Sequence, residues 1–82
     1  MLNLNEVVID RIQTAKRIRH LMEENALSVK DLMEILYLVR QDSIYKWLRG
    51  DQLPSLDQLY ALSQIFHTDI EDILVWEDVA DD

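Results

Sequence analysis

Apolar residues recur at three- and four-residue steps along most of this chain, which is the spacing of helices that bury one face. A first helix is expected from a cap at Asp10 to about Asn25. Its buried stripe comprises Ile12, Ala15, Ile18, Leu21 and Met22. A second helix is expected after Ser28, which suits an N-cap, with Asp31 in the first turn where a carboxylate meets the positive end of the helix. Its apolar face comprises Leu32, Ile35 and Leu36.

The second half of the chain predicts three more helices. A short one fits residues 41–48, and Gly50 is placed to end it in a left-handed cap. A capping box from Ser55 to Gln58 begins the fourth, and the segment 68–71 repeats this device for the fifth. The residues expected to face the core are Ile44, Trp47 and Leu48 of the third helix, Leu56, Leu59, Leu62, Ile65 and Phe66 of the fourth, and Ile70, Ile73 and Leu74 of the fifth.

These segments predict an all-α fold of five compactly packed helices. The 82 residues include one Gly and one Pro, too few turn residues for a β architecture of many strands. A chain of this length supports one hydrophobic core and therefore one domain. We interpret residues 1–9 as an N-terminal arm, residues 10–76 as the domain and residues 77–82 as an acidic tail.

The net charge of −8 is distributed unevenly along the chain. All eight Lys and Arg residues precede residue 51, together with seven of the sixteen acids, whereas nine acids and no Lys or Arg follow. One part of the surface is therefore close to neutral or locally basic, while the rest repels phosphate. This asymmetry favours a defined binding face with weak non-specific affinity for nucleic acid. The cations of the first helix, Arg11, Lys16, Arg17 and Arg19, are interpreted as an ordinary solvated face from which one or two reach phosphate.

Several chemistries have no support in the sequence. There is no cysteine, and His20 and His67 lie too far apart in the chain for a common metal-ligand spacing. No Gly-rich phosphate loop or nucleophile elbow is present, so we expect neither an enzyme nor a cofactor or metal site. No apolar run approaches the length of a membrane span and no signal-peptide pattern is present, which favours a cytoplasmic protein.

The order of the second and third helices suggests nucleic-acid binding. Two short helices are joined by a turn, and the second combines an inward Trp47 with exposed polar groups, as in a helix-turn-helix whose second helix enters the major groove of double-stranded DNA. Base edges are then expected to face Gln41, Asp42 and Tyr45, with Ser43 beside them. Phosphates are expected to contact Lys30, Arg40, Lys46 and Arg49.

The stretch from Ala15 to Val75 resembles the lambda-repressor-like (xenobiotic-response-element type) regulators of bacteria and phages. The resemblance rests on segments 16–21, 27–32, 44–50, 53–59, 61–63 and 70–74, above all on the block Trp47-x-x-Gly50 with Leu53-Pro54-Ser55-Leu56. It implies a five-helix fold, a homodimer on a two-fold DNA operator and a role in transcription control, as a repressor. The chain departs from the family at Val29, where Gln is frequent, and at Tyr37 and Leu38, where the turn usually has Gly and is one residue shorter.

The dimer interface is assigned to Ile73, Leu74, Val75 and Trp76, because these residues are more apolar than a lone surface helix requires. The alternative is a protein-binding module on the same fold, anti-repressor or antitoxin-like, with a protein partner in place of DNA. The acidic second half and Val29 favour this alternative. A structural oligomer has only the apolar segment near the C-terminal end in its favour.

Overall fold

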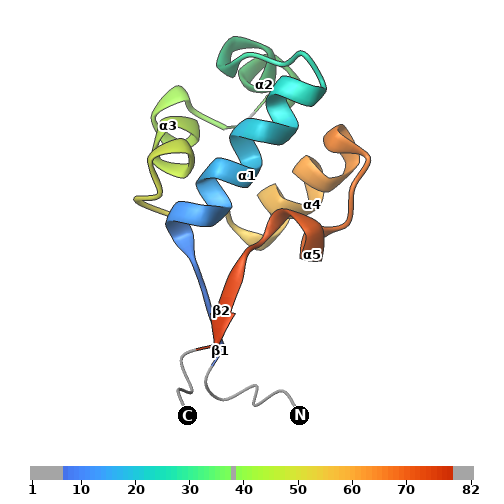
Figure 1. The fold of residues 1–82 in the computed structure, drawn as a ribbon. Coiled ribbons are helices and arrows are strands. Elements are labelled where there is room, and N and C mark those ends of the chain that lie inside the picture. Colours follow the sequence, from blue (N-terminus) through green and yellow to red (C-terminus); the bar gives the residue numbers. More distant parts are fainter. Residues whose placement is uncertain (1–6, 38, 79–82) are drawn as a thin grey trace.

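The computed structural model describes residues 7–37 and 39–78. Within them the chain forms β1 (Val7–Ile9), α1 (Arg11–Glu24), α2 (Val29–Ile35), α3 (Gln41–Arg49), α4 (Leu56–Phe66), α5 (Ile70–Ile73) and β2 (Trp76–Asp78) (Figure 1). Helix α1 lies at the centre, with α3 on one side of it and α4 and α5 on the other (Figure 1). The predicted all-α class with five helices is confirmed, and a small two-stranded sheet is added to it. None of the helices in this described part is long and apolar enough to cross a membrane.

Three helices begin where local side-chain chemistry predicts. The carboxylate of Asp10 accepts a hydrogen bond from the backbone N–H of Gln13 at 2.9 Å at the start of α1. Complete capping boxes begin α2 and α4, formed by Ser28 with Asp31 and by Ser55 with Gln58. Each box satisfies backbone N–H groups that have no partner inside the helix.

The fifth helix does not start as predicted. Its N-cap is Asp69 rather than Thr68, and no side-chain cap is present. The helix has only four residues, ending at Ile73, so the expected capping box at residues 68–71 is wrong. A single turn of helix has no intrinsic stability in water, so α5 depends on burial of Ile73 in the core.

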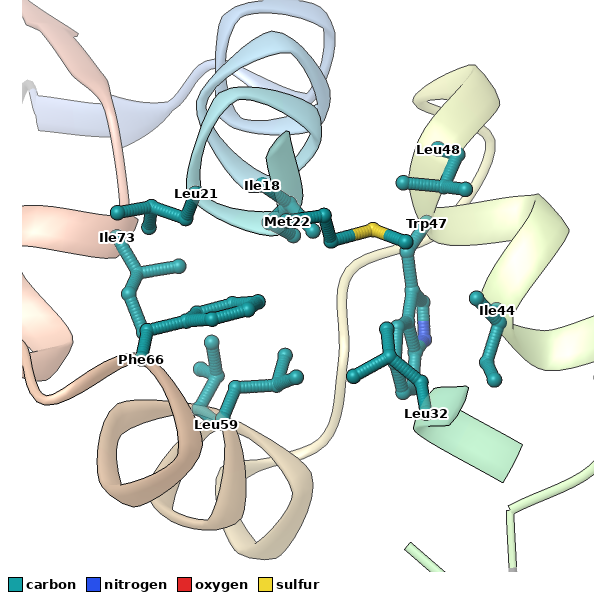
Figure 2. Close-up of a cluster of buried hydrophobic side chains, with 11 residues drawn as sticks. Ile18, Leu21, Met22, Leu32, Ile44, Trp47, Leu48, Leu59, Phe66 and Ile73 are labelled. Carbon is teal, nitrogen blue, oxygen red and sulfur yellow. The ribbon is translucent and has the colours of Figure 1, made fainter. Parts of the chain in front are cut away.

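The core is formed where the five helices meet, and each contributes at least one side chain (Figure 2). Its centre includes Trp47, which is 1% exposed and points from α3 toward Met22 of α1 and Leu32 of α2 (Figure 2). The buried cluster comprises Ile18, Leu21, Met22, Leu32, Ile44, Trp47, Leu48, Leu59, Leu62, Phe66 and Ile73. Each of these helices is too short to be stable in isolation, so this shared burial stabilises them together.

Three residues predicted to be inside are on the surface. Ile12 and Ile35 are about half exposed, and Leu56 is 75% exposed. All three lie in the first or last turn of their helices, where the neighbouring elements no longer cover the apolar stripe. Periodicity identifies the side of a helix that faces the core, but not how far along the helix the contact extends.

The sheet joins the two ends of the described chain. Strands β1 and β2 pair antiparallel, with Val7 opposite Asp78 and Ile9 opposite Trp76, and they extend from one end of the helical body (Figure 1). Sequence reasoning missed both strands, which lie in the segments interpreted as arm and tail and at their borders with the domain. A two-stranded sheet is marginal by itself, so it needs an anchor on the helices.

Thr14 of α1 provides part of that anchor. Its hydroxyl is buried, accepts a hydrogen bond from the N–H of Val75 at 2.9 Å and donates one to the carbonyl oxygen of Val75 at 3.4 Å. The N–H of Asp10 donates to the same carbonyl oxygen at 2.7 Å. The segment before β2 is therefore fixed along the start of α1.

The helical ridge expected over residues 73–76 is not present. Ile73 ends α5 and is fully buried in its own core, Leu74 is already extended, and Trp76 begins β2. Leu74 packs against the core, and the backbone of Val75 is hydrogen-bonded to Thr14. Among the four residues of the assigned interface, Trp76, which is 48% exposed, therefore offers most of the accessible apolar surface. The premise of a single helix presenting these four residues was wrong, because burial of Ile73 and pairing of β2 end the helix early.

Candidate nucleic-acid interface

Helices α2 and α3 are separated by a five-residue turn, from Leu36 to Arg40. Within it Tyr37 has a φ of +48°, the left-handed conformation that usually favours Gly, and its side chain is 85% exposed. Such a conformation costs a residue with a Cβ atom about 1–2 kcal/mol. Tyr37 therefore adopts the left-handed backbone conformation that Gly usually supplies in this turn, and it adds an exposed aromatic ring. Leu38, the other residue at which the turn was expected to depart from the family, lies outside the described residues.

Helix α3 has one side in the core and the other in solvent. Ile44, Trp47 and Leu48 are buried, as predicted. Ser43 is half-buried, and the exposed residues are Gln41, Asp42, Tyr45, Lys46 and Arg49. A helix fixed along one face and polar along the other is the arrangement required of a helix that enters the major groove.

The exposed side chains of α3 fall into two rows at four-residue spacing. Gln41, Tyr45 and Arg49 form one row, and Asp42 and Lys46 form the other, since residues four apart lie on the same face of a helix. Gln can bond adenine through two hydrogen bonds, and Asp can accept one from the amino group of cytosine. The rows therefore combine hydrogen-bonding groups at the start of α3 with cations toward its end.

The C-terminal end of α3 is closed by the loop that follows. Gly50 has a φ of +78°, which confirms the predicted left-handed cap. Its N–H donates to the carbonyl oxygen of Trp47 at 3.2 Å, and the N–H of Asp51 donates to that of Lys46 at 2.9 Å. Gly50 is also close-packed, because an added Cβ atom would lie 2.6 Å from Cδ1 of Ile12.

Three arginines of α1 are used inside the fold. Arg17 donates to the carbonyl oxygen of Asp72 at 2.8 Å, and Arg11 donates to that of Asp51 at 3.2 Å. Arg19 donates twice to the carbonyl oxygen of Leu48, at 3.0 and 2.8 Å. Arg11 and Arg19 remain exposed, as a solvated face requires, but the interpretation did not include these hydrogen bonds to backbone carbonyls of the later elements.

The phosphate candidates differ in their availability. The side chains of Lys30, Arg40 and Lys46 are exposed and make no hydrogen bond or ion pair within the part of the chain that the structure describes. Arg49 instead forms an ion pair with Asp51 across the Gly50 turn, at 2.8 Å. The close spacing of Arg49 and Asp51 in the sequence is the signal from which this pair could be predicted.

The pKa of the Asp31 carboxylate is lowered by its place in the cap of α2. The backbone N–H of Ser28, and to a lesser extent its hydroxyl, lower the pKa of Asp31 below its usual value. This carboxylate is thus part of the α2 cap rather than a ligand. Across residues 7–37 and 39–78, no group of three or more His, Asp or Glu side chains is arranged to hold a metal ion.

A short helix, a turn and a second helix with a solvated polar face, which share one core with α1 and α4, define a helix-turn-helix domain. The family model of the Cro/C1-type HTH DNA-binding domain matches residues 17–79. The chain therefore belongs to this family of DNA-binding domains, which confirms the resemblance to the lambda-repressor-like regulators. No match was found among curated proteins or among solved structures.

Proposed function

We propose that this protein is a sequence-specific transcriptional regulator of the repressor type that reads the major groove with α3. The observation that carries the proposal is the division of α3 between a face locked in the core and a face with exposed Gln41, Tyr45 and Lys46. Because the buried face fixes the orientation of the helix, the exposed groups are held in a constant arrangement for base contacts. We propose no catalytic role and no cofactor.

Within this function, the two kinds of side chain have separate tasks. Gln41, Asp42 and Tyr45, with Ser43 beside them, are proposed to face base edges. Lys30 at the start of α2, Arg40 at the start of α3, and Lys46 and Arg49 are proposed to bind phosphates, which set register rather than sequence. The excess of acids elsewhere then suppresses non-specific binding.

We further propose that the domain acts as a homodimer on a two-fold operator in the cytoplasm. The boundaries expected from the sequence, an arm at residues 1–9, a domain at 10–76 and a tail at 77–82, are revised in this proposal, because the paired strands β1 and β2 belong to the domain. Trp76 is the residue of the assigned interface that has the most exposed side chain. If it lies in the interface, Trp76→Ala shifts the monomer–dimer equilibrium toward monomer in sedimentation equilibrium. An unchanged equilibrium would place the interface elsewhere.

The experiment that tests DNA recognition is selection from a randomised duplex pool at low and moderate salt. Enrichment of a two-fold-symmetric site is expected. A dimer that places all four proposed cations of each protomer on phosphates would give a slope of log K against log salt of about −7. A folded protein that enriches no sequence, even at low salt, would refute the proposal.

Variants of the phosphate residues provide a sharper test on the selected site. The double variant Lys46→Ala with Arg49→Ala should lower affinity and flatten the salt dependence by up to about 1.8 per protomer. Lys16→Ala is the matched control, since Lys16 is an exposed cation of α1 that is outside the proposed interface. Equal losses in the control and the double variant would point to bulk charge rather than to these contacts.

A protein-binding module is the second candidate, and one observation favours it. Leu56 and Tyr60 lie one turn apart on α4, are 75% and 62% exposed, and belong to the half of the chain that carries nine acids and no Lys or Arg. A basic, partly apolar protein segment would complement such a surface. If Lys46→Ala with Arg49→Ala leaves a regulatory phenotype intact while Leu56→Asp with Tyr60→Asp abolishes it, this candidate replaces the DNA-reading one.

A further inference from the structure

The carbonyl groups at the C-terminal end of α3 obtain their hydrogen bonds from two sources. Gly50 and Asp51 supply backbone N–H groups from the loop that follows the helix. The carbonyl oxygen of Leu48 instead accepts two hydrogen bonds from Arg19 of α1, from Nε at 3.0 Å and from Nη2 at 2.8 Å. A guanidinium is suited to this position, because the last carbonyls of a helix carry partial negative charge and lack partners inside the helix.

Helix α1 contacts the same end of α3 at a second place. Arg11, eight residues before Arg19 and thus about two helical turns away, donates to the carbonyl oxygen of Asp51 at 3.2 Å. Between the two contacts, Ile12 packs closely against Gly50, where an added Cβ atom would lie 2.6 Å from Cδ1 and 3.2 Å from Cα of Ile12. The end of α3 is therefore held by side chains that come from another helix.

Such external support matters because α3 has nine residues and cannot maintain its own orientation. Its buried residues fix the helix in the core on one side. A rotation about that apolar contact would still move the exposed rows of Gln41 and Lys46 relative to a bound duplex. The hydrogen bonds from Arg19 tie the carbonyl oxygen of Leu48 to α1 and so oppose this rotation at the end of the helix.

We propose that Arg19 is a positioning residue that sets the orientation of α3 for DNA recognition without contacting DNA itself. The proposal rests on the proposed function, because it assigns Arg19 a task within the same interface. It differs from the ordinary expectation for an exposed arginine in a DNA-binding domain, which is a direct contact with phosphate. The two roles predict different responses to charge-preserving and charge-removing substitutions.

The test compares Arg19→Met and Arg19→Lys on the duplex that the native protein selects. If the fraction of molecules in which α3 has the orientation seen in the structure falls to a tenth of its native value, the apparent Kd rises about tenfold. Both variants are expected to show this loss, because Lys keeps the charge but not the paired donors. The slope of log K against log salt should stay at the native value, since the phosphate contacts are the same in number.

A second readout requires no DNA. In the free protein, exchange of the Gly50 and Asp51 amide hydrogens should become at least about tenfold faster in both variants, because the end of α3 opens more often. Lys16→Met is the matched control on the same helix and should change neither measurement. Far-UV circular dichroism verifies that each variant is folded, and Arg19→Lys is the milder change should Arg19→Met unfold.

Three outcomes contradict the proposal in different ways. A slope that flattens by about 0.9 per protomer in Arg19→Met and recovers in Arg19→Lys would show a phosphate contact instead. Native affinity together with native amide exchange in both variants would show that the contact does not hold α3. If the native protein selects no duplex, the proposed function fails and the DNA role of Arg19 fails with it, while amide exchange still reports whether Arg19 holds α3.

Discussion

Replacing Gly50 by alanine tests how tightly α1 and α3 are joined. A Cβ atom in the left-handed conformation costs about 1–2 kcal/mol. The same atom would lie 2.6 Å from Cδ1 of Ile12, 3.2 Å from Cα of Ile12 and 3.3 Å from the carbonyl oxygen of Arg11. Relieving such overpacking costs a further 1–3 kcal/mol or so. We therefore expect Gly50→Ala to lower the free energy of unfolding by about 2–5 kcal/mol, a large share of the stability of a small domain.

Two companion variants separate the backbone contribution from the steric one. Gly50→Asn keeps the steric conflict but tolerates the left-handed conformation better, so it should be less destabilising than Gly50→Ala. Adding Ile12→Ala to Gly50→Ala removes the closest contact and should restore part of the lost stability, although the contacts with Cα of Ile12 and the oxygen of Arg11 remain. The partial recovery would appear as non-additivity in a double-mutant cycle.

The assay is urea denaturation followed by far-UV circular dichroism, with the free energy of unfolding taken from the midpoint and slope. Ile12→Ala alone serves as the control, and its effect should be small because Ile12 is half exposed. A change of less than about 0.5 kcal/mol in Gly50→Ala would contradict the close packing of α1 on this turn. Strict additivity of the two substitutions would show that the side chain of Ile12 is not the obstacle.

Three further predictions concern charge and exposure. Asp51→Asn removes the ion-pair partner of Arg49 and a negative charge beside α3, so affinity for the selected duplex should rise, most at low salt; an equal or weaker complex would contradict this. Ser28 lowers the pKa of Asp31 below its ordinary value of 3.8. The ionised carboxylate therefore stabilises the fold fully at any pH above 3.8, and this stabilisation is lost as the pH falls through the lowered pKa. In Asp31→Asn, the corresponding part of the decrease in urea midpoint at acid pH should be absent, and an unchanged acid profile would show that the cap contributes nothing. Leu56→Gln should change the free energy of unfolding by less than about 0.5 kcal/mol, since the side chain is 75% exposed; a larger loss would place Leu56 in the core.

Features of the fold that depend on neighbours in the sequence were predictable. The caps at Ser28 and Ser55 involve partners three residues away, and Gly50 acts through its own backbone. In each case the residues that make the interaction are visible together in a short stretch of sequence. Pairing of β1 with β2 joins residues about seventy positions apart, and three-residue strands carry too little alternation to reveal it.

The candidate interface was predictable in the same restricted sense. The periodicity of α3 was enough to separate Trp47, inside, from Tyr45 and Lys46, outside. It gave no information on the partner of Arg19, because a backbone carbonyl has no signature in the sequence and lies on another helix. Knowing which cations are engaged within the fold required the three-dimensional arrangement.

The bond between Thr14 and Val75 also affects the order in which the chain folds during synthesis. The buried hydroxyl of Thr14 has Val75 as its partner, 61 residues later in the chain. Until the ribosome has released that later segment, α1 carries a polar group that burial would leave without a hydrogen bond, and β1 has no strand to join. A nascent chain truncated before Val75 is thus expected to keep the start of α1 hydrated and open to proteases. The start of α1 can become protected only after Val75 and β2 have been synthesised.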